Sequence, residues 1–156
     1  MRLRCAICFH TRWKYNGKML TIKGKLDQTE EGTWLTDRDC PKPMLTEDHV
    51  WPSVIVLESN NWPSQFLISF EFDGKSAAKT GKTFARLKQR VSPSCMLWTY
   101  TGLFETRTDW SNFKDSRFAS TDGVRFFGFG HMGWAPGQLR TKSVDDVEAI
   151  PDCTPE

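Results

Sequence analysis

Glycine recurs among large aromatic residues over positions 128–140, and this stretch constrains the fold more than any other part of the chain. It reads Gly-Phe-Gly-His-Met-Gly-Trp-Ala-Pro-Gly-Gln-Leu-Arg. Glycine allows a backbone to turn tightly or to approach another segment closely, while large rings pack around it. We therefore expect Gly128 and Gly130 to serve the architecture. The stretch carries no nucleophile motif, so it predicts a fold better than it predicts a reaction.

Short strands are predicted along most of the chain, chiefly from the alternation of apolar and polar side chains. They fall at 20–27, 33–37, 54–57, 66–72, 97–104, 124–129 and 138–143. A glycine-containing turn at 30–32 joins the first two as a hairpin. The segment 54–57 is apolar on both faces, which predicts a central strand. Gly102 predicts a bend or bulge in a long strand.

Two segments have helical spacing instead. Leu3 to Trp13 has apolar residues one turn apart, and Asn16-Gly17 then ends a short helix. A longer amphipathic helix is predicted from Ser76 to Val91, where Ser92-Pro93 follows. Its apolar stripe consists of Ala77, Gly81, Phe84, Leu87 and Val91.

These elements predict a mainly β chain of the α+β class. With 156 residues it has the size of one domain around one core. We expect that domain over 1–150 and a flexible tail over 151–156. The predicted architecture is a small OB-like barrel of about five to six strands, with the short N-terminal helix and one inserted amphipathic helix. An open α+β sandwich is the alternative.

Charge and hydropathy limit the classes of partner. The chain has 21 Lys and Arg against 19 Asp and Glu, and a net charge of +2 is too small to indicate a nucleic acid partner by itself. No apolar run approaches the ~18 residues that span a bilayer, so no transmembrane segment is expected. An unknown small molecule or protein remains the expected partner.

Two observations on the cellular compartment point in opposite directions. The N-terminus has two arginines but no following apolar core or cleavage site, which indicates a cytoplasmic chain as written. The five cysteines are many for a reducing compartment. An exported, periplasmic protein whose signal peptide was removed would explain both, and the two alternatives stay open.

Motifs spread over nearly the whole chain resemble a group of small bacterial domains with an OB-like or netrin-like β-barrel. The matching pieces are Cys5, 15–18, 20–24, 32–35, 39–41, 51–53, 102–107, 128–131, 135–136, Leu139, 142–144 and 146–147. The resemblance implies the barrel fold, an exported protein and a disulfide between Cys5 and Cys40. It implies almost nothing about function. This chain differs by adding Cys8, Cys95 and Cys153, whose pairing stays open.

His131 is the candidate catalytic side chain. An imidazole in a tight glycine turn can act as a base or a ligand near neutral pH. The alternative, which we prefer, is that it hydrogen-bonds the loop and fixes its shape. Cys5 and Cys8 have the C-x-x-C spacing of redox and zinc sites, but a second pair of zinc ligands is missing from the sequence.

The loop after the predicted hairpin carries several oxygen ligands. Asp37, Asp39 and Asp48 with His49 have the chemistry of a calcium site, but they lack the spacing of a calcium-binding loop. No other cofactor is expected. Solvated turn residues are the simpler interpretation.

Two surface features could bind a ligand. One face of the predicted helix carries a basic stripe, in which successive cations lie one turn apart: Lys75, Lys79, Lys82, Arg86 and Arg90. Such a stripe can bind single-stranded nucleic acid, but a solvated helix face is the preferred interpretation. Tryptophans offer flat faces for a sugar or an apolar ligand. Trp62 and Trp134 are the best candidates for exposure, and with Asp37, Asp39 and His49 they form the predicted binding surface.

Three functional hypotheses follow. The first is a binding or scaffolding module of an exported or envelope protein. The second is a small, metal-assisted hydrolase of esters or lactones that uses His131 or His49 with a carboxylate. The third is a single-stranded nucleic acid binder that uses the basic stripe.

Overall fold

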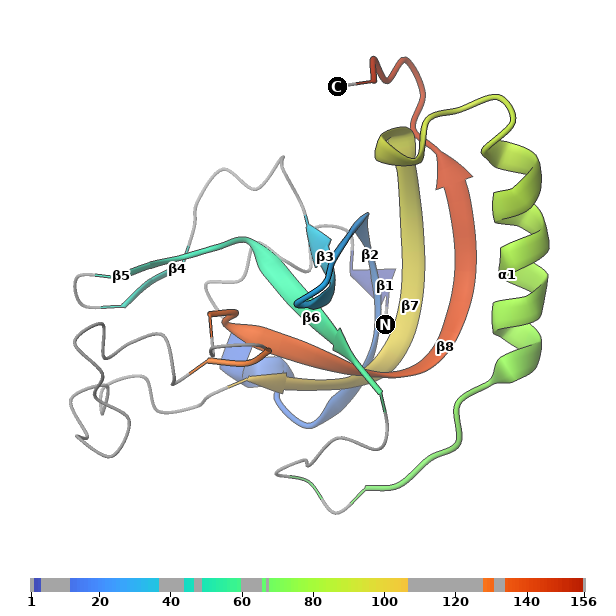
Figure 1. Ribbon diagram of the computed structural model, residues 1–156. Coiled ribbons are helices and arrows are strands. Elements are labelled where there is room, and N and C mark those ends of the chain that lie inside the picture. Colours follow the sequence, from blue (N-terminus) through green and yellow to red (C-terminus); the bar gives the residue numbers. More distant parts are fainter. Residues whose placement is uncertain are drawn as a thin grey trace.

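The chain folds into a mainly β, α+β structure with one α-helix among the residues described (Figure 1). The computed structural model describes residues 2–3, 12–36, 44–46, 49–59, 66, 68–106, 128–130 and 134–155. The strands are β1 (Arg2–Leu3), β2 (Lys18–Thr29), β3 (Gly32–Thr36), β4 (Met44–Thr46), β5 (His49–Trp51), β6 (Val54–Glu58), β7 (Met96–Thr106) and β8 (Gly137–Ala149). The helices are α1 (Gly74–Leu87) and the 3-10 helices η1 (Arg12–Tyr15) and η2 (Pro93–Cys95).

The main sheet is mixed, and its strands lie in the order β1-β2-β3-β6-β8-β7. β2 changes partner along its length: Lys18–Gly24 pairs with β7 and Lys25–Thr29 pairs with β3, both antiparallel. β6 lies between β3 and β8, and its pairing with β8 is parallel. β4 and β5 form a separate hairpin, which extends away from the main sheet in Figure 1. The predicted strands at 20–27, 54–57, 97–104 and 138–143 are confirmed, and the one at 33–37 is confirmed over Thr33–Thr36, since Asp37 lies outside the described residues.

The core contains one layer of apolar side chains to which β2, β3, β6, β7 and β8 all contribute. Its buried members are Leu20, Ile22, Leu35, Ile55, Tyr100, Phe104 and Leu139. Burial raises the pKa of the Tyr100 hydroxyl to about 12, since the phenolate would lose its hydration. Alternation along each strand brings these residues to one face.

β7 and β8 form a long antiparallel ribbon that curves strongly (Figure 1). The register between them shifts between Thr99 and Tyr100 and again between Thr101 and Gly102. A Cβ atom on Gly102 would lie 2.2 Å from the carbonyl oxygen of Arg140. The two backbones therefore approach each other at a place where only glycine fits, which confirms the predicted irregularity at Gly102.

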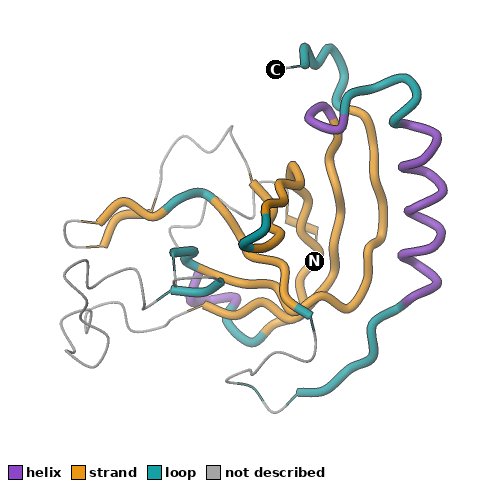
Figure 2. The backbone as a smooth tube through the Cα atoms, in the orientation of Figure 1, coloured by secondary structure: helices purple, strands orange, loops and turns teal. Residues whose placement is uncertain are grey.

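α1 covers the outer edge of β8, beyond the three residues that pair with β6 (Figure 2). The Thr80 hydroxyl donates to the carbonyl of Val144 (2.8 Å), and the N–H of Val144 donates to the Ser76 hydroxyl (3.2 Å). The N–H of Asp73 donates to the carbonyl of Lys142 (2.7 Å). These bonds satisfy backbone groups that an uncovered edge strand would leave open.

The buried stripe of α1 differs from the predicted one at a single position. Thr80 is buried whereas Gly81 is exposed, because the Thr80 hydroxyl donates a hydrogen bond to the edge of β8. Phe84 packs as predicted, with its ring centroid 5.1 Å from that of Trp98. The carboxylate of Asp73 caps the helix by accepting from the N–H groups of Lys75 and Ser76.

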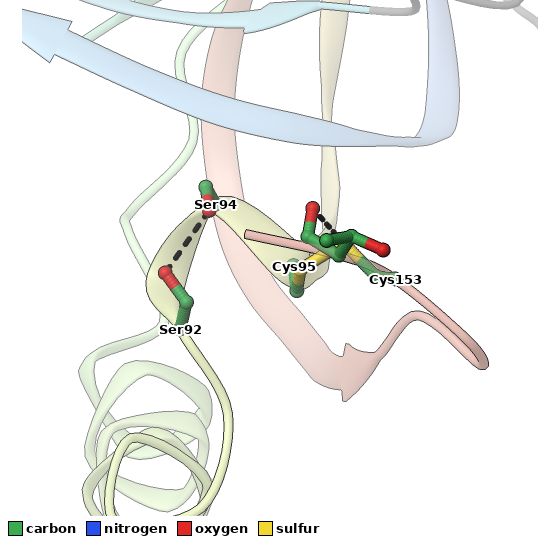
Figure 3. The surroundings of a disulfide bond; sticks show 5 residues. Ser92, Ser94, Cys95 and Cys153 are labelled. Carbon is green, nitrogen blue, oxygen red and sulfur yellow. Dashed lines mark hydrogen bonds between the residues drawn. A yellow bond between two sulfur atoms is a disulfide. The ribbon is translucent and has the colours of Figure 1, made fainter. Parts of the chain in front are cut away.

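A disulfide joins Cys95 to Cys153 and fixes the segment after β8 to the start of β7 (Figure 3). The two residues are 58 positions apart in sequence. The N–H of Ile150 also donates to the carbonyl of Cys95 (2.9 Å). Cys153 lies within the segment 151–156 that was predicted to be a flexible tail, so that segment is anchored at this residue. The predicted bridge between Cys5 and Cys40 lies outside the described residues.

Two predictions of local structure are wrong. Leu3 belongs to β1, which pairs in parallel with β2 at Ile22, and not to a helix beginning at that residue. The predicted strand at 66–72 forms no ladder where it is described, because β6 and α1 already occupy the edge of β8. The sheet is not a regular barrel, since β8 meets β6 over Gln138–Arg140 alone.

Replacing Gly102 with alanine should destabilise the fold by about 2 to 3 kcal/mol, because the added methyl would meet the Arg140 carbonyl. Chemical denaturation measures this. Gly81→Ala is the matched control: open space surrounds it on an exposed helix, so the same change should stabilise the protein by up to about 1 kcal/mol. Equal stability of the two variants would contradict the close approach.

Cys153→Ser should lower the free energy of unfolding by up to about 4 kcal/mol, the chain-entropy value for a loop of this length. Denaturation without reductant measures the loss. In reductant the variant and the unchanged protein should unfold alike, since both then lack the bridge. Peptide mapping that finds Cys95 joined to another cysteine would contradict the assignment.

Candidate binding face

Two tryptophans pack together on the face of the sheet opposite the main core. Trp34 comes from β3, and Trp134 lies just before β8. Their ring centroids are 5.2 Å apart and their planes are nearly perpendicular, at 83°. Leu35 faces the main core, so its neighbour Trp34 faces the other side. This edge-to-face geometry is a favourable one for an aromatic pair.

A small apolar cluster forms the floor beneath the two indoles. Val54, Val56 and Ala135 are buried there, while Trp34 and Trp134 are half-buried. Val56 is the register partner of Trp34 across β3 and β6. We call these five residues the Trp face. Part of each indole ring is exposed to solvent, and the buried side of each ring packs on the apolar floor.

The glycine-rich stretch holds Trp134 in place. Phe129 and Ala135 exchange two backbone hydrogen bonds, of 2.8 and 3.1 Å. Gly130 has a φ of +74°, and a Cβ there would lie 2.8 Å from a methyl of Val56. Both observations require glycine, which confirms the expectation that Gly130 is structural. The turn therefore lies directly against the floor of the Trp face.

Buried polar side chains anchor the start of β8 next to this face. Gln138 and Glu105 are register partners, and the Gln138 amide donates to the Glu105 carboxylate. The Thr106 hydroxyl donates to the carbonyl of Pro136 (2.9 Å). The N–H of Thr106 donates to the side-chain oxygen of Asn16 (2.9 Å). Because these groups are buried and hydrogen-bonded, they fix the segment that carries Trp134.

Charged side chains continue the same side of the sheet. Arg140 is 5% exposed; its guanidinium donates to the carbonyl of Ile68 (3.2 Å) and lies 5.6 Å from the centre of the Phe70 ring. Glu58, its register partner on β6, is half-buried. Burial raises the pKa of the Glu58 carboxyl above its usual 4.5, because the carboxylate is poorly hydrated there.

The structure describes only part of the predicted binding surface. Trp134 is described and is half-buried. The backbone of His49 lies in β5. Its side chain falls outside the described part of the chain, as do Asp37, Asp39, Trp62 and the predicted catalytic residue His131.

The basic stripe lies on the exposed surface of α1. All five cations are exposed: Lys75, Lys79, Lys82, Arg86 and Arg90. They lie at the far side of the molecule from the β4–β5 hairpin in Figure 1. In the described residues, no group of three or more His, Cys, Asp or Glu could hold a metal ion.

The sequence carries a signal for the position of Trp34. It alternates with the core residue Leu35 in a predicted strand, which places it on the opposite face. The Glu105–Gln138 pair had no such signal. The two residues are 33 positions apart, and only the register of β7 against β8 brings them together.

No protein-family model, curated protein sequence or solved structure matches this chain. Within the described residues, no helix is long and apolar enough to cross a membrane.

Glu58→Gln should stabilise the protein at pH 7 and lose this advantage on acidification. The raised pKa means that the folded state binds the proton more tightly than the unfolded state. The cost of the buried charge is thus present above the folded pKa and absent below the unfolded value near 4.5. Thermal melting of the variant and of the unchanged protein from pH 7 to pH 4 measures the difference between their melting temperatures. A difference that does not depend on pH would contradict the raised pKa of Glu58.

Proposed function

We propose that this chain is an OB-type binding module that holds the ring of a neutral oligosaccharide on the Trp face. The observation that carries the proposal is the half-exposed Trp34–Trp134 pair, fixed over a buried apolar floor. A binding module needs such a preformed surface, because ligand pockets are largely built before the ligand arrives.

The order of strand pairing supports an OB-type fold. Starting from β2, the pairings run through β3, β6, β8 and β7 and return to β2. The OB fold is a partly open five-stranded barrel whose second and third strands and two loops bind oligosaccharides or oligonucleotides. Here the second and third strands of that circuit are β3 and β6, which carry three residues of the Trp face. Trp134 lies in the connection between the fourth and fifth strands, β7 and β8.

The charge beside the Trp face favours a sugar over a nucleic acid. Asp27 is the register partner of Trp34 and is exposed. Its carboxylate accepts a long hydrogen bond of 3.4 Å from the Thr36 hydroxyl. A carboxylate can accept further bonds from sugar hydroxyls but repels phosphates. The flat face of an indole ring can pack against the apolar face of a sugar ring.

The disulfide between Cys95 and Cys153 supports an exported protein, because structural disulfides persist in oxidising compartments. An envelope or secreted location is also where free glycans occur. The hydrolase hypothesis on His131 or His49 and the nucleic acid hypothesis remain untested predictions.

Labelling with 5-fluorotryptophan tests the proposal. The single replacements Trp34→Phe, Trp51→Phe and Trp134→Phe assign three of the seven tryptophan fluorine signals. Titration with cellohexaose or chitohexaose should shift the signals of these two residues and leave that of the fully buried Trp51 in place. Trp134→Ala should weaken binding about tenfold or more, as loss of a stacking ring implies.

Melting curves separate binding from folding in the same variants. Trp134 is half-buried, so Trp134→Ala should leave a folded protein with a cooperative transition. If neither oligosaccharide moves the Trp34 and Trp134 signals, or if the shifts appear equally at Trp51, the Trp face is not a sugar site.

A further inference from the structure

We propose that the exposed flank of α1 is a second binding surface, which takes a linear polyanion bearing carboxylates, an acidic polysaccharide. The surface consists of the basic stripe and a hollow at its C-terminal end. It is independent of the Trp face and uses none of its residues.

Positive charge is concentrated in the helix segment 75–90, while the rest of the chain carries a net negative charge. Residues 75–90 contain six Lys or Arg and no Asp or Glu. The rest of the chain has 15 Lys and Arg against 19 Asp and Glu, a net charge of −4 beside +6 on the helix segment. The net charge of the whole chain is therefore only +2, although the helix segment is strongly cationic. A local field of this kind attracts anions even when the net charge is near zero.

Four cations of the stripe lie in a row along α1, and Arg90 follows in the turn after the helix ends at Leu87. At 1.5 Å rise per residue, the span from Lys75 to Arg86 is about 17 Å, with one cation every ~5 to 6 Å. At 3.6 residues per turn, these four fall within a stripe about 60° wide. A narrow row with this spacing matches a linear polymer that carries one charge per repeating unit, roughly the length of a sugar ring.

These cations have no acidic partner among the residues the structure describes. Lys23 and Glu148 form the ion pair found there. Two acids on β8, the strand that α1 covers, accept hydrogen bonds within that strand or from β7: Asp145 accepts from Thr101 and Ser143 (2.5 Å each), and Asp146 accepts from the N–H of Val147. The stripe is therefore open to an external anion.

A surface hollow of about 370 Å³ lies at the C-terminal end of the stripe. It is lined by Thr83, Arg86, Leu87, Gln89 and Arg90. Guanidinium groups bind carboxylates through paired hydrogen bonds. The hydroxyl and amide suit sugar hydroxyls, and the leucine offers an apolar contact for a ring face. This set of groups fits one residue of a uronic acid polymer.

The composition of the flank favours a polysaccharide over single-stranded nucleic acid. Binding of single strands depends on exposed aromatic rings for base stacking. The exposed residues beside the cations on α1 are small: Ala78, Gly81 and Ala85. Phe84, the aromatic residue of α1, is turned toward Trp98. The disulfide also favours an oxidising compartment, where acidic glycans are found.

Calorimetric titration with polygalacturonate at low salt tests the proposal, with the fully methyl-esterified polymer as the uncharged control. The double variant Arg86→Gln with Arg90→Gln should weaken binding to polygalacturonate about tenfold or more, as loss of two charge-assisted contacts implies. The matched control is Lys14→Gln with Lys18→Gln, which removes equal charge from exposed residues next to η1. It should change the affinity less than about twofold, a difference that surface charges away from a contact typically make.

Competition with poly(dT) separates the two polymers. The proposal expects weaker binding of poly(dT) than of polygalacturonate, and unchanged polygalacturonate binding by Trp134→Ala. Tighter binding of poly(dT) that is lost in the Arg86/Arg90 variant would overturn it in favour of nucleic acid. Equal binding of the esterified polymer, equal loss in both double variants, or no binding to polygalacturonate would overturn it as well. All four substituted residues are exposed, so both double variants should remain folded, which circular dichroism checks.

Discussion

The close approach of two backbones at Gly102 determines the shape of this protein. Because Gly102 has no side chain, the backbone of β7 can approach the Arg140 carbonyl more closely than a residue with a Cβ atom would allow. The register shifts beside it let the long ribbon of β7 and β8 curve, so that β7 pairs with β2 from Trp98 to Phe104 while β8 pairs with β6 at its start and then extends past it. The shared core and the edge left for α1 both follow from this bend.

The two surfaces proposed for ligands depend on different parts of that arrangement. The Trp face is built where β3, β6 and the start of β8 meet, and its glycine turn is fixed against Val56. The cationic flank belongs to a helix that contacts the opposite portion of β8 through Ser76 and Thr80. An apolar platform and a charged row thus occur in one chain without competing for the same residues.

Much of the fold could be predicted from local patterns, and the rest depended on pairing. Alternation located β2, which buries one face in the core, and a continuous apolar run located β6, which is buried on both faces. The same alternation failed at 66–72, since a strand also needs a free edge and α1 occupies it. For the site, the sequence pointed to Trp134 and to Gly130 but not to their partner Trp34. Contacts between distant strands, such as Glu105 with Gln138, have no local signature.

The way α1 protects β8 has a consequence for aggregation. A neighbouring strand would hold this edge through a continuous ladder, whereas the helix holds it through the three hydrogen bonds at Lys142 and Val144. Release of the helix would expose an open strand edge that a second copy of the chain could extend. Self-association of this protein under mild heating should therefore begin with detachment of α1, before the core of the sheet has melted.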